Sequence, residues 1–186
     1  MRILSGKFKG KKLFLPSDKK TRPLKNLVKE SIFNLLQHSN KINIRLENAN
    51  ILDLFSGSGS FGLECLSREA QNVIFFENYS KALKILNKNL KLLKINKNYE
   101  VIDVCCFDYF KSNRSLSKKF DIIFIDPPFK EMRINELLEN IIEKKLLKKN
   151  GVFIIHRHKN DKTKITPKLE IFENRKYGLS KIFFGS

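Results

Sequence analysis

The sequence predicts an α/β fold of the Rossmann-like, doubly wound kind, with a seven-stranded, mostly parallel sheet and an antiparallel edge strand. Apolar runs of strand length alternate with stretches of helical periodicity along most of the chain. A glycine-rich turn at residues 51–62 joins the first central apolar run directly to a helical pattern. The last two apolar runs flank Tyr177-Gly178, which is typical of an antiparallel hairpin. With 186 residues, the chain is expected to fold as one domain, 1–186.

Residues 1–16 are expected to form a small basic β-hairpin outside the main fold, with strands at 2–4 and 12–15. The turn carries four lysines beside Phe8, an arrangement suited to phosphate groups with a base or sugar nearby. A solvated hairpin tip without a ligand is the alternative interpretation. The four lysines are Lys7, Lys9, Lys11 and Lys12.

Residues 17–40 are predicted to form a polar linker, closed by Arg22-Pro23, and a helix. The apolar residues of this helix recur with a period of 3.6 and predict one buried face. They are Leu24, Leu27, Val28, Ile32, Leu35 and Leu36. The outer face is expected to carry Lys25, Lys29 and Glu30.

Residues 50–186 are expected to supply the main sheet. The first strand begins at residue 51, and further strands are predicted at 73–77, 101–104, 120–126, 151–155, 169–172 and 181–184. Helices are predicted between them at 61–68, 82–93 and 134–142. Because strands and helices alternate, the central strands are expected to be parallel.

The glycine loop indicates a ligand site. Gly57, Gly59 and Gly62 have the spacing G-x-G-x-x-G, which lets backbone N–H groups approach a ligand closely. Glu77 closes the next strand, at the distance expected for an acid that binds a ribose. A nicotinamide dinucleotide and S-adenosylmethionine both satisfy this pattern. Asp53, just before the loop, would repel a pyrophosphate and attract the sulfonium and ammonium groups of S-adenosylmethionine, which is therefore favoured.

A second candidate site is the stretch Asp126-Pro127-Pro128-Phe129, which follows an apolar strand. The two prolines stiffen the turn, and the strand end is where open α/β sheets place their sites. Asp126 and the Pro127 carbonyl can accept hydrogens of an amino group on a flat base, while Phe129 stacks on the ring. This combination favours methyl transfer to a base amine without a metal. A stiffened turn without chemistry is the alternative.

The chain is strongly basic, with 37 Lys and Arg residues against 19 Asp and Glu residues and a formal net charge of +18. A polyanion such as nucleic acid is the expected partner, although a biased genome composition would also raise the lysine count. Cys65, Cys105 and Cys106 lack metal-binding spacing and are expected to be reduced packing residues. No apolar run approaches the ~20 residues that span a bilayer, so a cytoplasmic protein without a membrane partner is expected.

The whole pattern resembles the RsmD-like family of bacterial 16S rRNA guanine-N2 methyltransferases. The resemblance covers nearly the full length. It rests on residues 2–6, 9–13, 22–23, 28–34, 53–59, 62–68 and 126–129. It implies a class I methyltransferase that uses S-adenosylmethionine, needs no metal and methylates one guanine N2, guanine 966 in the family. It also implies action on 16S rRNA in the small subunit or its assembly intermediate. Nothing in the sequence suggests more than a monomer or indicates an obligate protein partner.

By position, the resemblance assigns two groups of residues. Donor binding is assigned to Asp53, Phe55, Gly57, Gly59 and Glu77, with Cys106, Phe107 and Asp108 toward the adenine. Handling of the guanine is assigned to Asp126, Pro127 and Phe129. Binding of RNA is expected, on the ground of charge, from the four hairpin lysines and Arg22.

The sequence departs from the family pattern at several positions. Leu24 and Leu27 stand where the family usually has threonine and arginine, and His156 stands where a carboxylate is common. His156 and His158 have a spacing compatible with metal ligands, but no third ligand accompanies them. Arg157 facing an RNA phosphate, or all three residues solvating the strand end, are the other interpretations.

Two alternative functions are open at this stage. An adenine-N6 methyltransferase of DNA or RNA would share the Asp126-Pro-Pro-Phe motif, but it normally carries a separate target-recognition region. A non-catalytic RNA-binding assembly factor would share the fold and the basic charge. Binding of the donor and identification of the methylated nucleoside discriminate among the three.

Overall fold

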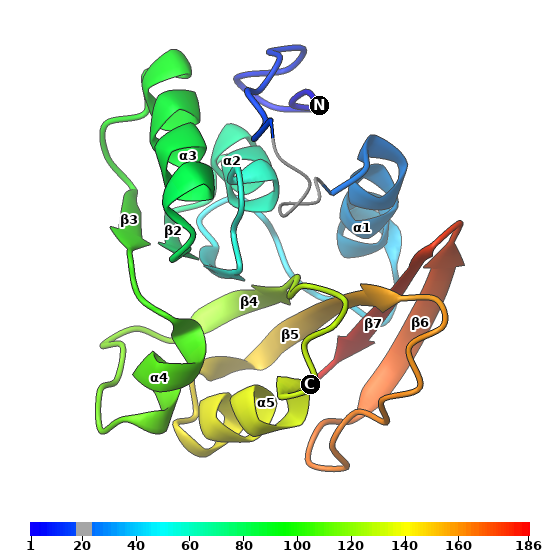
Figure 1. The fold of residues 1–186 in the computed structure, drawn as a ribbon. Coiled ribbons are helices and arrows are strands. Elements are labelled where there is room, and N and C mark those ends of the chain that lie inside the picture. The colour runs from blue at the N-terminus through cyan, green and yellow to red at the C-terminus, as the bar shows by residue number, and fades with distance from the viewer. Residues whose placement is uncertain (18–23) are drawn as a thin grey trace.

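The computed structural model describes residues 1–17 and 24–186 and contains a seven-stranded sheet in the order β3-β2-β1-β4-β5-β7-β6 (Figure 1). The strands are β1 Asn50–Leu54, β2 Asn72–Phe76, β3 Tyr99–Ile102, β4 Phe120–Ile125, β5 Leu147–His158, β6 Ile171–Tyr177 and β7 Ser180–Gly185. Strands β1 to β5 are parallel, and β7 lies antiparallel between β5 and β6. The predicted sheet is confirmed, with its antiparallel strand one place in from the edge.

Helices cover both faces of this sheet (Figure 1). One face carries α1 Asn26–His38, α2 Ser60–Ser67 and α3 Ser80–Leu92, and the other carries α4 Cys106–Lys111 and α5 Ile134–Glu143. Successive strand residues point to opposite faces, so each strand contributes to both layers of core. Ile122 and Phe124 pack with the first group of helices, whereas Ile123 and Ile125 pack with the second. Among the described residues, no helix has the length and apolar character needed to cross a membrane.

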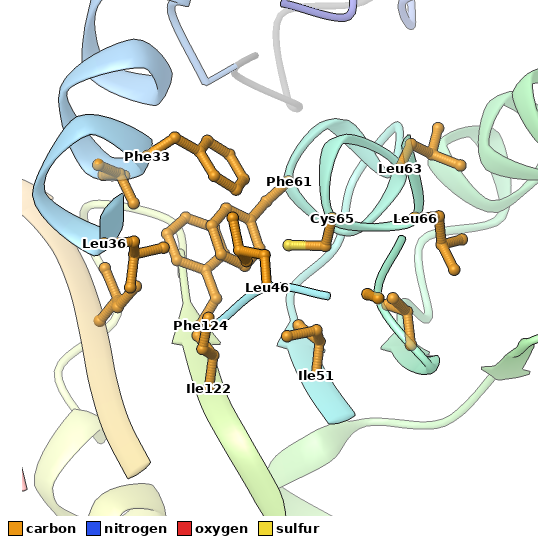
Figure 2. Close-up of a cluster of buried hydrophobic side chains, with 14 of the residues drawn as sticks. Phe33, Leu36, Leu46, Ile51, Phe61, Leu63, Cys65, Leu66, Ile122 and Phe124 are labelled. Atoms are coloured by element: carbon orange, nitrogen blue, oxygen red, sulfur yellow. The ribbon is translucent and has the colours of Figure 1, made fainter. Parts of the chain in front are cut away.

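A stack of three aromatic rings joins α1 and α2 to β4. The rings of Phe33 and Phe61 are 5.3 Å apart between centroids, and those of Phe61 and Phe124 are 4.0 Å apart. Figure 2 shows these rings among buried aliphatic side chains from the same layer. Offset aromatic pairs add stability beyond the area they bury. Because Phe61 and Phe124 also line the pocket described below, this stack forms one of its walls.

Four elements differ most from the positions that periodicity predicts. Strand β3 begins at Tyr99, earlier than expected, and strand β6 covers Ile171–Tyr177 instead of 169–172. Strand β5 begins at Leu147, because a polar segment ahead of Gly151 joins the sheet through the pairing of Phe120 with Leu147. Helix α4 is not predicted at all. It is too short for a periodic apolar pattern to be recognised in the sequence.

The N-terminal hairpin is present but does not lie outside the main fold as expected. Its two arms are joined by one antiparallel bridge, between Arg2 and Lys12, instead of two regular strands. It packs on α2, where the backbone N–H of Lys7 donates to the Ser67 carbonyl at 2.7 Å. Ile3 is completely buried in the first core layer. The hairpin is therefore held by the core, while its four lysine side chains are exposed.

Helix α1 differs from the sequence prediction at two positions. Leu27, assigned to the buried face, is 64% exposed. Lys29, assigned to the outer face, is completely buried, and its ammonium group lies 3.2 Å from the carboxylate of Glu64 on α2. A buried lysine needs such a partner, and no sequence period within α1 reveals a partner on another helix.

Candidate active site

A pocket of about 240 Å³ lies where the carboxyl ends of β1, β2 and β4 meet. Parallel α/β sheets bind ligands at this edge. The lining includes seven of the residues that the sequence identifies as candidates. They are Asp53, Phe55, Gly57, Glu77, Asp126, Pro127 and Phe129. The two candidate stretches, far apart in the sequence, therefore share one cavity.

Asp53 fastens the glycine loop to the sheet. It is the last but one residue of β1 and has only 1% of its surface exposed, and its Oδ2 accepts a hydrogen bond of 2.9 Å from the backbone N–H of Gly62. Ser56 donates to the Asp53 carbonyl at 2.6 Å and closes the turn from the other side. Phe55, between them, has a positive φ of 59°, a costly conformation for a residue with a side chain. Strain of this kind is found where a loop is shaped for a ligand.

The glycines of the loop serve different purposes. Gly57 lines the pocket, whereas Gly59 is not a lining residue and instead caps α2 with a φ of 81°. A Cβ on Gly62 would lie 2.3 Å from the ring of Phe75 on β2, so the third glycine permits close contact between helix and strand. The spacing G-x-G-x-x-G thus reflects one ligand position, one turn position and one packing position.

Glu77 holds the loop from the end of β2. Its Oε2 accepts a hydrogen bond of 2.7 Å from the Gly57 N–H, and its Oε1 accepts one of 2.8 Å from the Tyr79 N–H. Each carboxylate oxygen has more than one lone pair, so both can still accept a hydroxyl hydrogen from a ligand. The side chain is 9% exposed and lines the pocket. This geometry suits the ribose role expected from the sequence.

Three carboxyl groups, those of Asp53, Glu77 and Asp126, line the pocket of an otherwise basic protein. Burial is the largest cause that raises the pKa of Asp53 well above its ordinary value, and the charges of Asp126 and Glu77 raise it further. Burial also raises the pKa of Glu77, against the hydrogen bonds that lower it. A ligand with positive charge would relieve this repulsion, whereas a pyrophosphate would increase it. The residues present therefore fit S-adenosylmethionine and do not fit a dinucleotide.

The Asp126-Pro-Pro-Phe turn forms the opposite wall. Pro127 is buried, and the carboxylate of Asp126 is 15% exposed at the pocket surface. Ile125 on β4 is in register with Ile155 on β5, so Asp126 and His156 follow side by side. The Nδ1 of His156 lies 2.7 Å from Oδ1 of Asp126. The ring of Phe129 stands edge-on to His156, with 5.7 Å between centroids.

His156 and its neighbours do not behave as the sequence interpretations proposed. His156 is 2% exposed and does not solvate the strand end. Arg157 is 1% exposed, pairs with Asp161 and donates to the Glu131 carbonyl at 2.8 Å, so it does not face an RNA phosphate. Within residues 1–17 and 24–186, no group of three or more His, Cys, Asp or Glu side chains is arranged to hold a metal ion.

Some candidates lie away from the pocket. Cys106, Phe107 and Asp108 open α4 and are not lining residues. Phe107 is one layer behind the pocket, since its ring lies 5.6 Å from that of Phe55 between centroids. Their role toward an adenine stays a prediction. Arg22 lies outside the described residues.

The hairpin lysines lie on the turn that packs against the C-terminal end of α2, the end away from the glycine loop. All four side chains are exposed, and the ammonium of Lys7 lies 5.8 Å from the centroid of the Phe8 ring. Pro16, at the end of the hairpin, and Leu24, shortly before α1, are lining residues of the pocket. Sequence reasoning missed both as site residues, and it also missed Asn78 and Tyr79. The last two could have been found, since they follow Glu77 directly at the strand end.

Comparison with known proteins shows to which family the chain is related. A family model described as "Conserved hypothetical protein 95" matches residues 1–186. The Ribosomal RNA small subunit methyltransferase D of Haemophilus influenzae is 34% identical over 168 residues, which cover 90% of this chain and 83% of that protein. The protein of the same name from Buchnera aphidicola subsp. Baizongia pistaciae is 33% identical over 167 residues, 90% of this chain and 81% of that protein. The chain belongs to the RsmD family.

Solved structures agree with this membership of the RsmD family. HI0767 of Haemophilus influenzae is 30% identical with a TM-score of 0.77, covering 99% of this chain and 96% of that chain. YhhF of Escherichia coli, 24% identical, has a TM-score of 0.82 over 100% of this chain and 96% of that chain, and shows the fold alone. SMU.776, crystallised with SAH, has a TM-score of 0.64 and 18% identity over 83% of this chain and 48% of that chain. The predicted Rossmann-like methyltransferase fold is confirmed.

Proposed function

We propose that this protein transfers a methyl group from S-adenosylmethionine to the exocyclic N2 of a guanine in 16S rRNA, guanine 966 in the RsmD family. One observation carries the proposal. The Asp126-Pro-Pro-Phe turn and the acid-flanked glycine loop line the same pocket. The base amine that accepts the methyl group and the cationic methyl donor would therefore meet there. The names of the RsmD relatives, which are small-subunit rRNA methyltransferases, support the RNA substrate.

The donor would be held by the glycine loop side of the pocket. Glu77 would accept the ribose hydroxyls, and Asp53 would place negative charge near the sulfonium and ammonium groups. Phe55, Gly57 and Gly59 would shape the loop around it. Cys106, Phe107 and Asp108 would lie toward the adenine, behind Phe55. S-adenosylmethionine supplies an activated methyl group, so no metal is required.

The acceptor side would activate a weak nucleophile. The N2 lone pair of guanine is delocalised into the ring, which makes the amine a poor nucleophile. Asp126 and the Pro127 carbonyl would accept its two hydrogens and favour a pyramidal nitrogen with an available lone pair. Phe129 would stack on the base and fix its plane. The remaining acceleration would come from alignment of the reacting atoms, a positioning effect.

The RNA would be held by the hairpin and delivered to the pocket as a flipped base. A base inside a helix cannot reach Asp126, so the target must leave its stack. The exposed hairpin lysines would bind the flanking phosphates, with Arg22 added from the following segment. The residues proposed for this contact are Lys7, Lys9, Lys11, Lys12 and Arg22.

We further infer that the chain works as a single domain and a monomer in the cytoplasm. Its substrate would be 16S rRNA in the small subunit or an assembly intermediate, and no obligate protein partner is required. Three parts of the chain would act together, namely the hairpin (residues 1–16), the linker with its helix (17–40) and the sheet (50–186). Packing of the hairpin on α2 and of α1 on the sheet supports this.

The decisive experiment is methyl transfer from labelled S-adenosylmethionine to small subunits that lack the modification, followed by nucleoside analysis of the RNA. N2-methylguanosine is expected. Asp126→Ala should abolish transfer while calorimetry still detects donor binding, and Glu100→Gln on exposed β3 should leave transfer unchanged. Methyladenosine would assign the protein to the adenine-N6 class. Donor binding without transfer to any RNA would contradict the proposal.

The RNA contact has its own test. Each lost phosphate contact lowers the slope of log affinity against log salt by roughly 0.7 to 0.9. Replacing Lys9, Lys11 and Lys12 by alanine should therefore weaken RNA binding and flatten its salt dependence. A matched control replaces Lys118, Lys119 and Lys149, which are exposed at the opposite edge of the sheet. Equal effects of the two triple variants would show that total charge, and not the hairpin, governs RNA binding.

A further inference from the structure

A row of three polar side chains crosses the sheet from the pocket to β7, the strand next to the edge. Asp126 follows β4, His156 is on β5 and Ser180 begins β7. The His156 ring lies between the other two, with Nδ1 2.7 Å from Asp126 Oδ1 and Nε2 2.8 Å from Ser180 Oγ. The ring is 2% exposed and Ser180 is 5% exposed. Such a row inside an apolar sheet requires that every member be hydrogen-bonded.

The direction of the hydrogen bonds follows from the chemistry of the groups. An ionised carboxylate can only accept, so the Nδ1 of His156 donates to Asp126. In the neutral ring Nε2 then accepts, and the hydroxyl of Ser180 donates to it. Ser180 thereby fixes the ring, and the ring fixes one oxygen of Asp126. Within residues 1–17 and 24–186 no hydrogen bond to the second oxygen of Asp126 is seen, and we assign that oxygen to the substrate.

The row contains the same three residue types as a hydrolase triad, but its orientation is reversed. In a hydrolase the serine meets the substrate, and the carboxylate is buried behind the histidine. Here Asp126 lines the pocket, whereas Ser180 is buried and is not a lining residue. The row therefore serves the carboxylate and not a nucleophilic serine.

We propose that His156 is a positioning residue for methyl transfer, which orients the carboxylate of Asp126 toward the acceptor amine. This inference rests on the proposed function. As the bond between N2 and the methyl carbon forms, the electron pair of the carbon–sulfur bond returns to sulfur, and one N2 proton must leave. Asp126, held at Oδ1 by His156, takes that proton on its second oxygen.

His156 also supports the stacking ring. Phe129 stands edge-on to His156 at 5.7 Å between centroids and to His158 at 4.8 Å. One buried side chain thus contacts both the group that accepts the amine hydrogens and the ring that stacks on the base. A test must separate the hydrogen bond from the loss of this ring contact.

The matched pair His156→Asn and His156→Leu makes that separation. Both side chains lose the ring and have four heavy atoms in a similar branched shape, but only asparagine keeps an N–H donor near the position of Nδ1. In transfer to small subunits, His156→Leu should lower kcat about 100-fold, the cost expected of a misplaced catalytic group, with little change in KM. His156→Asn should recover most of that loss. Calorimetric donor affinity should be unchanged in both, and thermal unfolding should show that both are folded.

Several outcomes would overturn the inference. Equal kcat values for His156→Asn and His156→Leu would show that the hydrogen bond to Asp126 is irrelevant. A change confined to KM, or loss of donor binding, would assign His156 to the shape of the pocket. Ser180→Ala should give a smaller loss of kcat than His156→Leu, and no loss would remove Ser180 from the row. The wild-type product is measured first, because absence of N2-methylguanosine there would contradict the proposed function and not the role of His156.

Discussion

Replacement of Glu64 is expected to be among the most destabilising single changes in the described core. Its carboxylate is completely buried and accepts hydrogen bonds from the backbone N–H groups of Leu4, at 2.7 Å, and Ser5, at 2.9 Å. The same carboxylate lies 3.2 Å from the Lys29 ammonium and 3.0 Å from Nε of Arg68. One side chain therefore ties the hairpin, α1 and α2 together.

The magnitude follows from what Glu64→Gln leaves behind. The amide has nearly the same shape but no charge, and its NH₂ group faces donors, so Lys29 remains buried without a counter-charge. Breaking one side of a buried ion pair costs about 3–5 kcal/mol. An unsatisfied backbone N–H costs about 1–3 kcal/mol in addition, although contributions within one network do not add fully. A loss of about 3–5 kcal/mol in the free energy of unfolding is expected.

Urea unfolding followed by circular dichroism measures this loss. The double variant Lys29→Met/Glu64→Gln should be more stable than Glu64→Gln, since it removes the unpaired buried charge. Glu143→Gln, which disrupts an exposed pair with Lys168, is the control and should leave stability unchanged. A second readout is hydrogen exchange at Leu4 and Ser5, which should accelerate in Glu64→Gln. A loss below about 1 kcal/mol, or a double variant no better than Glu64→Gln, would refute the reasoning.

Two further predictions concern the glycine loop and the carboxyl groups of the pocket. Gly62→Ala should lower the free energy of unfolding by about 1–3 kcal/mol, because the added Cβ would lie 2.3 Å from the Phe75 ring. Urea unfolding measures this loss, and an unchanged midpoint would contradict the tight packing of α2 on β2. The raised pKa values of Asp53 and Glu77 mean that the folded state favours the neutral forms of these carboxyl groups. Their contribution to the free energy of unfolding is therefore complete below the unfolded pKa and is lost as the pH rises through the folded pKa. A cationic donor favours the ionised forms, so calorimetric affinity for S-adenosylmethionine should rise as the pH is raised from the ordinary range of carboxyl groups through the raised pKa values of Asp53 and Glu77. A flat profile would show that these carboxyls do not meet the donor's charge.

The sheet and the position of the pocket were predictable because local patterns determine them. Apolar runs mark the central strands, and the glycine loop and the Asp126 turn both follow such runs. Carboxyl ends of parallel strands meet at one edge, so the two motifs had to converge. By contrast, α4 gives no periodic signal, and a donor role for Cys106 rested on analogy with relatives.

Contacts between elements account for most of what the sequence did not reveal. The burial of Lys29 depends on Glu64 from another helix, and the docking of the hairpin depends on the same carboxylate. His156 is an intermediate case. It directly follows the apolar core of β5 as Asp126 follows that of β4, so knowledge that these two strands are neighbours would have paired the residues.

The charged residues of the protein are distributed so that an anionic ligand and a cationic ligand would be attracted to different parts of it. The chain carries a net charge of +18, yet the lining of its pocket includes the carboxyl groups of Asp53, Glu77 and Asp126. Phosphates are attracted to the exposed hairpin lysines and repelled by the pocket, whereas a sulfonium ligand is attracted inward. An RNA held by its backbone could therefore extend only an uncharged base toward Asp126. In this arrangement the acids would select the donor and also keep the RNA backbone outside the reaction site.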